Sequence, residues 1–115
     1  MTEFQNYKTM AKHLDGFVRI DKNGTFYLSG GTTELMGLKE GEGVMIYLCR
    51  RKNCVFLYKE KEEAYTVRLH NSGMRFIDQD CATFVRNFFG WAGDGPLRLS
   101  AREDGEKIRL VPKSE

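Results

Sequence analysis

The segment VRIDKNGTFYL, residues 18–28, is the stretch from which the rest of the chain is interpreted. Apolar and charged side chains alternate from Val18 to Ile20, as in a strand that buries one face. The dipeptide Asn23-Gly24 is a strong hairpin signal, and we expect a type I′ turn because that turn needs positive φ at both central residues. The segment therefore predicts a β-hairpin.

The same pattern returns in the second half of the chain as VRLHNSGMRFI, residues 67–77. At a constant offset, the matched pairs are Val18/Val67, Arg19/Arg68, Ile20/Leu69, Asn23/Ser72, Gly24/Gly73, Tyr27/Phe76 and Leu28/Ile77. An internal repeat of this kind determines the fold. We therefore interpret the chain as two degenerate copies of one ββαββ unit.

The two units are predicted to span residues 17–60 and 66–111, within a single domain of residues 1–115. The charged segment 59–64 separates them. One unit of this size buries too little apolar surface to offset its chain entropy, so each unit is expected to cover the other. The predicted fold is mainly β (α+β), with the two units forming a pseudo-twofold barrel or sandwich.

Three short helices are expected. Apolar residues at helical spacing within residues 1–16 predict an N-terminal arm with a short amphipathic helix. The helix of the first unit is expected to be capped by Thr32 or Thr33. In the second unit, Asp80 is the expected cap of a helix over residues 81–89.

The remaining strands are predicted as two further hairpins. Residues 44–49 and 54–58 are apolar on both faces, which is typical of strands in a barrel, a sandwich or a subunit interface. This pattern makes them the candidate contact for a homodimer. Residues 97–101 and 107–111 alternate cleanly, as expected of strands with one solvent-exposed face.

The composition is that of a globular protein, with 41% hydrophobic and 30% charged residues. No apolar run approaches the roughly 20 residues that a membrane helix needs, and the N-terminus lacks a signal-peptide pattern. We therefore expect a cytoplasmic protein without membrane contact. The net charge of +2 does not by itself require a nucleic-acid partner.

The three cysteines, Cys49, Cys54 and Cys81, are expected to be reduced, since their number is odd and no signal peptide precedes them. The C-x4-C spacing of the first two, without a second pair, does not match a zinc site. No phosphate-loop, dinucleotide-binding or paired-carboxylate motif occurs. We expect no catalytic residue, no metal and no cofactor.

A set of residues in the first unit follows a recognisable order of strand, glycine turn, strand, helix and hairpin. These residues are Arg19, Gly24, Tyr27, Leu28, Leu35, Gly37, Leu38, Gly41, Val44 and Ile46. In this order the chain resembles the AbrB-like swapped-hairpin family over residues 17–60 and, with lower specificity, over residues 66–111. The family usually has a proline where this chain has residues 29–31, Ser-Gly-Gly. The resemblance implies a pseudo-twofold pair that binds DNA and regulates transcription.

The resemblance also implies that basic residues of the two first hairpins contact DNA. Carried over by position, these are Arg19, Lys22, Arg68 and Arg75. The sequence adds the most basic hairpin tip in the chain, formed by Arg50, Arg51 and Lys52. Arginine suits this role because its planar fork binds phosphates and guanine edges bidentately. The alternative is that all seven are ordinary solvent-facing residues.

Two other functions fit the sequence. A protein-interaction or assembly module without nucleic acid agrees with the nearly balanced charge. Alternatively, the order of elements from residue 44 onward resembles Pur-alpha-like single-strand binders, with Tyr47, Phe56 and Tyr58 on an open sheet face. The swapped-hairpin arrangement requires the two first hairpins to lie side by side, whereas the single-strand binder requires residues 44–78 to form one antiparallel meander.

Overall fold

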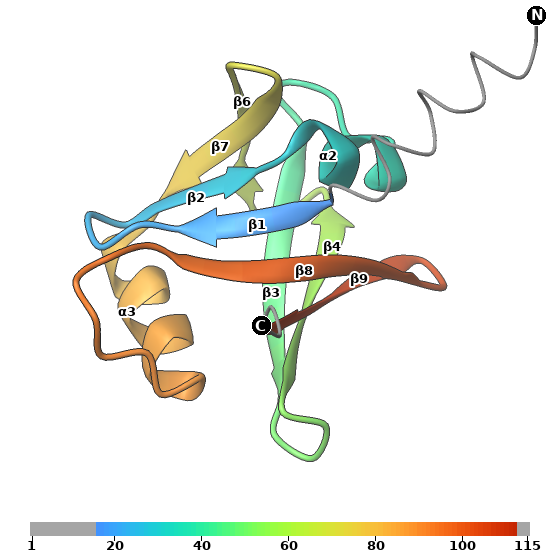
Figure 1. Cartoon of the computed structure of the whole chain (residues 1–115). Coiled ribbons are helices and arrows are strands. Elements are labelled where there is room, and N and C mark those ends of the chain that lie inside the picture. The colour runs from blue at the N-terminus through green and yellow to red at the C-terminus, as the bar shows by residue number, and fades with distance from the viewer. Residues whose placement is uncertain (1–15, 113–115) are drawn as a thin grey trace, which may run out of the picture.

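The computed structural model describes residues 16–112 (Figure 1). The helix predicted within residues 1–16 therefore lies outside the described residues, apart from its last position. Between residues 16 and 112, no helix is both long and apolar enough to cross a membrane.

The described chain contains nine strands and two helices. In chain order they are β1 (Phe17–Ile20), β2 (Thr25–Leu28), α2 (Gly30–Met36), β3 (Gly43–Cys49), β4 (Cys54–Glu60), β5 (Tyr65–Thr66), β6 (Arg68–His70), β7 (Gly73–Ile77), α3 (Gln79–Phe88), β8 (Leu97–Asp104) and β9 (Lys107–Pro112).

All nine strands belong to one antiparallel sheet with the order β5-β3-β4-β9-β8-β1-β2-β7-β6. Its two edge strands, β5 and β6, are separated along the chain by Val67 alone. Val67 continues the pairing with the β3 side, since its N–H donates to Glu42 O and its carbonyl accepts from Gly41 N, both at 3.0 Å. The sheet therefore closes into a nearly complete barrel, which confirms the predicted mainly β fold.

The strand pairing repeats between the two halves of the chain. β2 pairs with β7 where the two first hairpins meet, and β4 pairs with β9 where the two second hairpins meet. The contact of β1 with β8 is matched by that of β5 with β3. The first hairpins thus lie side by side, as the swapped-hairpin arrangement requires.

The strands between residues 44 and 78 do not form a meander. β4 pairs with β3 and β9, and β5 pairs with β3. The strand order on which the Pur-alpha-like alternative was based is therefore wrong.

The two first hairpins differ in length by one residue. Ile20 lies opposite Phe26 in the first hairpin. At the equivalent position of the second, Leu69 lies opposite Met74. The second turn is therefore one residue shorter, and the constant offset predicted from the sequence fails after the turn.

This shift changes which residues of β2 and β7 correspond. Tyr27 corresponds to Arg75, which it directly faces across the β2–β7 ladder, and not to Phe76. The predicted match of Leu28 with Ile77 is also wrong, because Leu28 is fully buried and Ile77 is 58% exposed. A one-residue slip in a strand moves each side chain to the other face.

The turns also differ from the predicted type I′ form. Gly24 has a φ of 99°, but Asn23 does not have a positive φ. Gly24 N donates to Asp21 O at 3.1 Å, as in a type I turn followed by a glycine bulge. In the shorter second turn, Asn71 has the positive φ, at 53°.

Both helices begin earlier than predicted, because the residue directly after the preceding strand is the cap. Ser29 caps α2 in place of Thr32 or Thr33, and its Oγ accepts from the Thr32 N–H at 3.3 Å. Asp78 caps α3 in place of Asp80. The polar side chain that first follows each strand accepts from one of the free N–H groups at the start of the helix, Thr32 N in α2 and Cys81 N in α3.

The barrel interior is filled by one apolar cluster. Its members are Val18, Ile20, Phe26, Leu28, Leu38, Val44, Val55, Leu57, Val67, Met74, Phe76, Ala82, Val85, Leu97, Leu99, Ala101, Ile108 and Leu110. At its centre, Phe76 stacks on Phe26 at 4.6 Å and on Tyr65 at 4.7 Å between ring centroids. The outer face of β3 is not buried as its apolar pattern suggested, because Tyr47 is 46% exposed.

α3 is tied to the first hairpin by a buried arginine. Arg86 donates through Nη1 to Ile20 O at 3.2 Å and through Nη2 to Gly93 O at 2.6 Å. The start of α3 lies against the turn of that hairpin, where a side chain at Gly24 would come within 2.8 Å of the Gln79 backbone.

We expect Gly73→Ala to destabilise the fold, because a Cβ at this position would overlap the carbonyl oxygen of Leu28 on the neighbouring strand. Overpacking of this kind costs about 2 kcal/mol or more. Gly95→Ala is the matched control, since nothing lies within 4 Å of its added Cβ. Its free energy of unfolding should change by less than about 0.5 kcal/mol. Equal urea midpoints for the two variants would contradict the β2–β7 register.

Asp78 should make stability depend on pH. The backbone hydrogen bond from Cys81 and the hydroxyl of Tyr65 hold the pKa of its carboxyl below the ordinary 3.8. A lowered folded pKa gives stability that is fully present above the unfolded value and lost as the pH falls through the folded value. Asp78→Asn retains a capping oxygen but does not titrate. Wild type should therefore lose more free energy of unfolding than Asp78→Asn between about pH 5 and pH 2. Urea unfolding of both proteins at each pH measures this loss. An equal loss in the two proteins would refute the prediction.

Candidate nucleic-acid interface

Four arginines and one tyrosine form a straight row across the outer face of five neighbouring strands. Arg98 on β8 lies opposite Arg19 on β1, and Arg19 lies opposite Tyr27 on β2. Tyr27 lies opposite Arg75 on β7, and Arg75 lies opposite Arg68 on β6. With strands about 4.8 Å apart, this arginine row spans roughly 19 Å.

The arginine row contains three of the seven predicted site residues, drawn from both units. Arg19 belongs to the first unit, and Arg68 and Arg75 belong to the second. They come together because β2 pairs with β7, which places the outer faces of the two first hairpins next to each other.

Tyr27 supports the centre of the arginine row. Its ring lies beneath the guanidinium of Arg19, whose Cζ is 5.0 Å from the ring centroid. The His70 ring packs edge-on against it at 5.7 Å, and the Tyr27 hydroxyl lies 3.4 Å from Ser72 Oγ. These contacts leave Tyr27 only 8% exposed, so it positions cations more than it offers a free stacking surface.

Arg98 is held in a similar way at the end of the row. Its Cζ lies 4.6 Å from the ring centroid of Phe17. An arginine stacked on an aromatic face keeps its N–H edge directed outward, where it is available to an anion.

The charge of the arginine row is only partly neutralised. Arg19 Nε donates to Asp21 Oδ1 at 2.9 Å, and both side chains are more than a quarter exposed. Within residues 16–112, Arg68, Arg75 and Arg98 have no carboxylate partner. Three cationic groups therefore remain available on one face, although the net charge of the chain is only +2.

Lys22 lies outside the arginine row, in the turn between β1 and β2. Its Nζ contacts Asp94 Oδ1 at 3.0 Å, with the two side chains 70% and 91% exposed. An ion pair this exposed contributes little and dissociates readily. Lys22 is thus at the edge of the same hairpin, but the structure does not place it among the four arginines.

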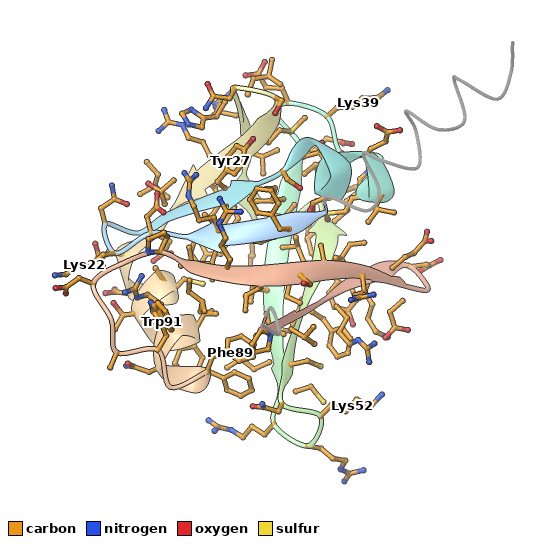
Figure 2. All side chains as sticks on the ribbon, in the orientation of Figure 1. Lys22, Tyr27, Lys39, Lys52, Phe89 and Trp91 are labelled. Carbon is orange, nitrogen blue, oxygen red and sulfur yellow. The ribbon has the colours of Figure 1, made fainter. Side chains whose placement is uncertain are left out.

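The basic tip of the β3–β4 hairpin, Arg50, Arg51 and Lys52, is separate from the arginine row. Figure 2 shows Lys52 at the end of the projecting hairpin and Tyr27 on the outer face of the barrel, far from it. The seven predicted residues therefore do not form one continuous site.

A hollow of about 480 Å³ adjoins the row. Phe17, Tyr27, Ser72 and the start of α2 line it. Glu34 also lines the hollow, whereas none of the four arginines does.

Arg98 completes the row, although sequence reasoning did not include it among the site residues. Alternation along its strand shows that Arg98 faces outward, but only the pairing of β1 with β8 places it beside Arg19. The sequence therefore predicts that Arg98 faces outward, but it does not predict which residue lies next to it.

Comparison of the chain with protein-family models, with curated proteins and with solved structures found no match. In the described part of the chain, no group of three or more His, Cys, Asp or Glu side chains is arranged to hold a metal ion.

Proposed function

We propose that this protein binds DNA through the arginine row and acts as a DNA-binding regulator of the AbrB-like type. The observation that carries the proposal is the alignment of Arg98, Arg19, Arg75 and Arg68 on four of five adjacent strands, with Tyr27 on the fifth. Phosphate contacts by arginine supply most of the affinity of such proteins for DNA.

The pairing of the two units supports duplex DNA as the ligand. Arg19 and Arg68 are equivalent residues of the two units and lie on either side of Tyr27 and Arg75. The row is thus centred near the pseudo-twofold axis. The two strands of duplex DNA are likewise related by twofold axes, so a twofold-centred surface contacts both strands in an equivalent way.

The resemblance to the AbrB-like family adds to this proposal. It implied that the first hairpins lie side by side and that their arginines contact DNA. The pairing of β2 with β7 agrees with the first expectation. The second is the part that a binding experiment has to test.

A protein-interaction module is the second candidate, favoured by exposed apolar side chains around α3. Phe84 on α3 is 55% exposed, Ile77 at the end of β7 is 58% exposed, and Trp91 after α3 is 40% exposed. This function predicts a partner protein and no salt-dependent affinity for DNA.

Replacing two arginines of the row should weaken DNA binding. Wild type should bind a duplex of about 20 base pairs with a log–log salt slope of about −2.7, because the three arginines without a carboxylate partner each neutralise one phosphate and contribute about −0.9. In Arg68→Ala/Arg75→Ala the slope should fall to about −0.9. The measurement is fluorescence anisotropy at several salt concentrations between about 50 and 200 mM.

Arg50→Ala/Arg51→Ala is the matched control, since it removes the same charge from the remote hairpin tip. Its slope should stay near that of wild type. Loss of binding in this variant alone would assign the site to the tip and refute the arginine row. No salt-dependent binding by wild type to duplex or single-stranded DNA would refute DNA binding altogether.

A further inference from the structure

The projecting β3–β4 hairpin carries a second chemical group that the arginine row does not use. Its loop has the sequence CRRKNC, residues 49–54, and a cysteine at each end. Figure 1 shows the hairpin extending away from the rest of the barrel, and Figure 2 places Lys52 at its tip.

Cys49 and Cys54 are direct cross-strand partners, and they form the last pair before the loop. Opposed residues of antiparallel strands have Cα atoms about 4.5–5.5 Å apart, which lies within the range for a disulfide. Directly opposed residues also point to the same face of the sheet, and Cys49 is near enough to act on the pKa of the Cys54 thiol. A disulfide can therefore form here with little movement of either strand.

The two thiols differ in accessibility. Cys54 is 1% exposed, whereas Cys49 is partly exposed. Burial raises the pKa of the Cys54 thiol. An external reagent consequently reaches Cys49 first, and Cys54 is placed to react with whatever forms there.

The electrostatic surroundings favour an anionic reagent. Arg50, Arg51 and Lys52 are exposed in the loop, and the loop contains no acidic residue. Arg109 and Lys52 also lie near enough to Cys54 to act on the charge of its thiolate. Such a cluster of cations attracts small anions by long-range steering.

We propose that Cys49 and Cys54 are a redox-active dithiol whose substrate is a small anionic disulfide of the glutathione disulfide class. The Cys49 thiolate attacks one sulfur of the substrate, forms a mixed disulfide and releases one glutathione thiolate. The Cys54 thiolate then attacks the Cys49 sulfur and releases the second. The protein loses two electrons and two protons, and these yield two molecules of the reduced thiol.

The basic tip has a defined part in this reaction. Its charges concentrate the anionic disulfide next to Cys49, which raises the rate at which the substrate meets the attacking sulfur. This assigns a role to Arg50, Arg51 and Lys52 that is independent of DNA binding.

Cys81 gives an internal comparison. Cys81 is on α3 and lies near Tyr65 of β5 and the capping residue Asp78, and burial raises the pKa of its thiol. The groups that act on this pKa include no other cysteine, whereas Cys49 and Cys54 are paired across β3 and β4. It should therefore not join the disulfide.

The test is to equilibrate the full chain in glutathione buffers from fully reduced to fully oxidised, alkylate the remaining thiols and map them by mass spectrometry. Wild type and Cys81→Ala should each lose two hydrogens and two alkylation sites, at Cys49 and Cys54. Cys54→Ala should instead accumulate glutathione on Cys49. Three alkylatable thiols in wild type at the oxidised end, or a disulfide that includes Cys81, would overturn the proposal.

Peptide mapping of wild type and Cys81→Ala suffices even if Cys54→Ala fails to fold, because neither protein is altered in the hairpin. The role of the tip is tested separately by the rate of oxidation of Arg50→Ala/Arg51→Ala/Lys52→Ala. Oxidation by glutathione disulfide should slow about tenfold, while oxidation by the uncharged hydroxyethyl disulfide should be unchanged. Equal rates with glutathione disulfide for wild type and variant would overturn the steering by the tip.

Discussion

The antiparallel ladder between β2 and β7 is the contact on which the rest of the structure depends. It joins the two units at Tyr27 and Arg75, and it fixes which face of each first hairpin points outward. A shift of β7 by one residue would bury Arg75 and expose Phe76. The backbone of Gly73 approaches the Leu28 carbonyl so closely that no side chain fits there, so β7 has little freedom to move relative to β2.

The two units also support each other through their helices. α3 of the second unit begins against the Gly24 turn of the first, and α2 of the first unit begins against Ser72 in the turn of the second. Each helix start thus closes on a hairpin that the other unit supplies. Because a unit of this size has little core of its own, this exchange makes the stability of the fold a shared property of both halves.

The strands of the barrel were largely predictable, because each has a local pattern of alternation and a turn at its end. The caps at Ser29 and Asp78 were missed because several polar residues follow each strand, and the sequence does not show where the strand stops. The shift in the repeat was missed because Gly24 and Gly73 align in the sequence, whereas Gly24 lies in a turn and Gly73 lies in β7.

The candidate site was only partly predictable for a related reason. The outward direction of an arginine follows from alternation within one strand, but its neighbours follow from pairing between distant strands. Arg19, Arg68 and Arg75 were placed by the repeat itself. Arg98 needed the contact of β1 with β8, and the distance of Lys52 from the row needed the direction in which the β3–β4 hairpin extends.

The closure of the barrel at Val67 makes the two ends of the arginine row unequal. Beyond Arg19 the neighbouring strand supplies Arg98. Beyond β6 the described part of the chain supplies no arginine: Gly41 and Glu42 bond to Val67, and Glu40 Oε2 accepts from Leu69 N at 3.1 Å. A surface with true twofold symmetry holds a polymer equally well in either direction. Because the two halves of this chain differ in sequence, the row has different groups at its two ends, and its two directions are not equivalent.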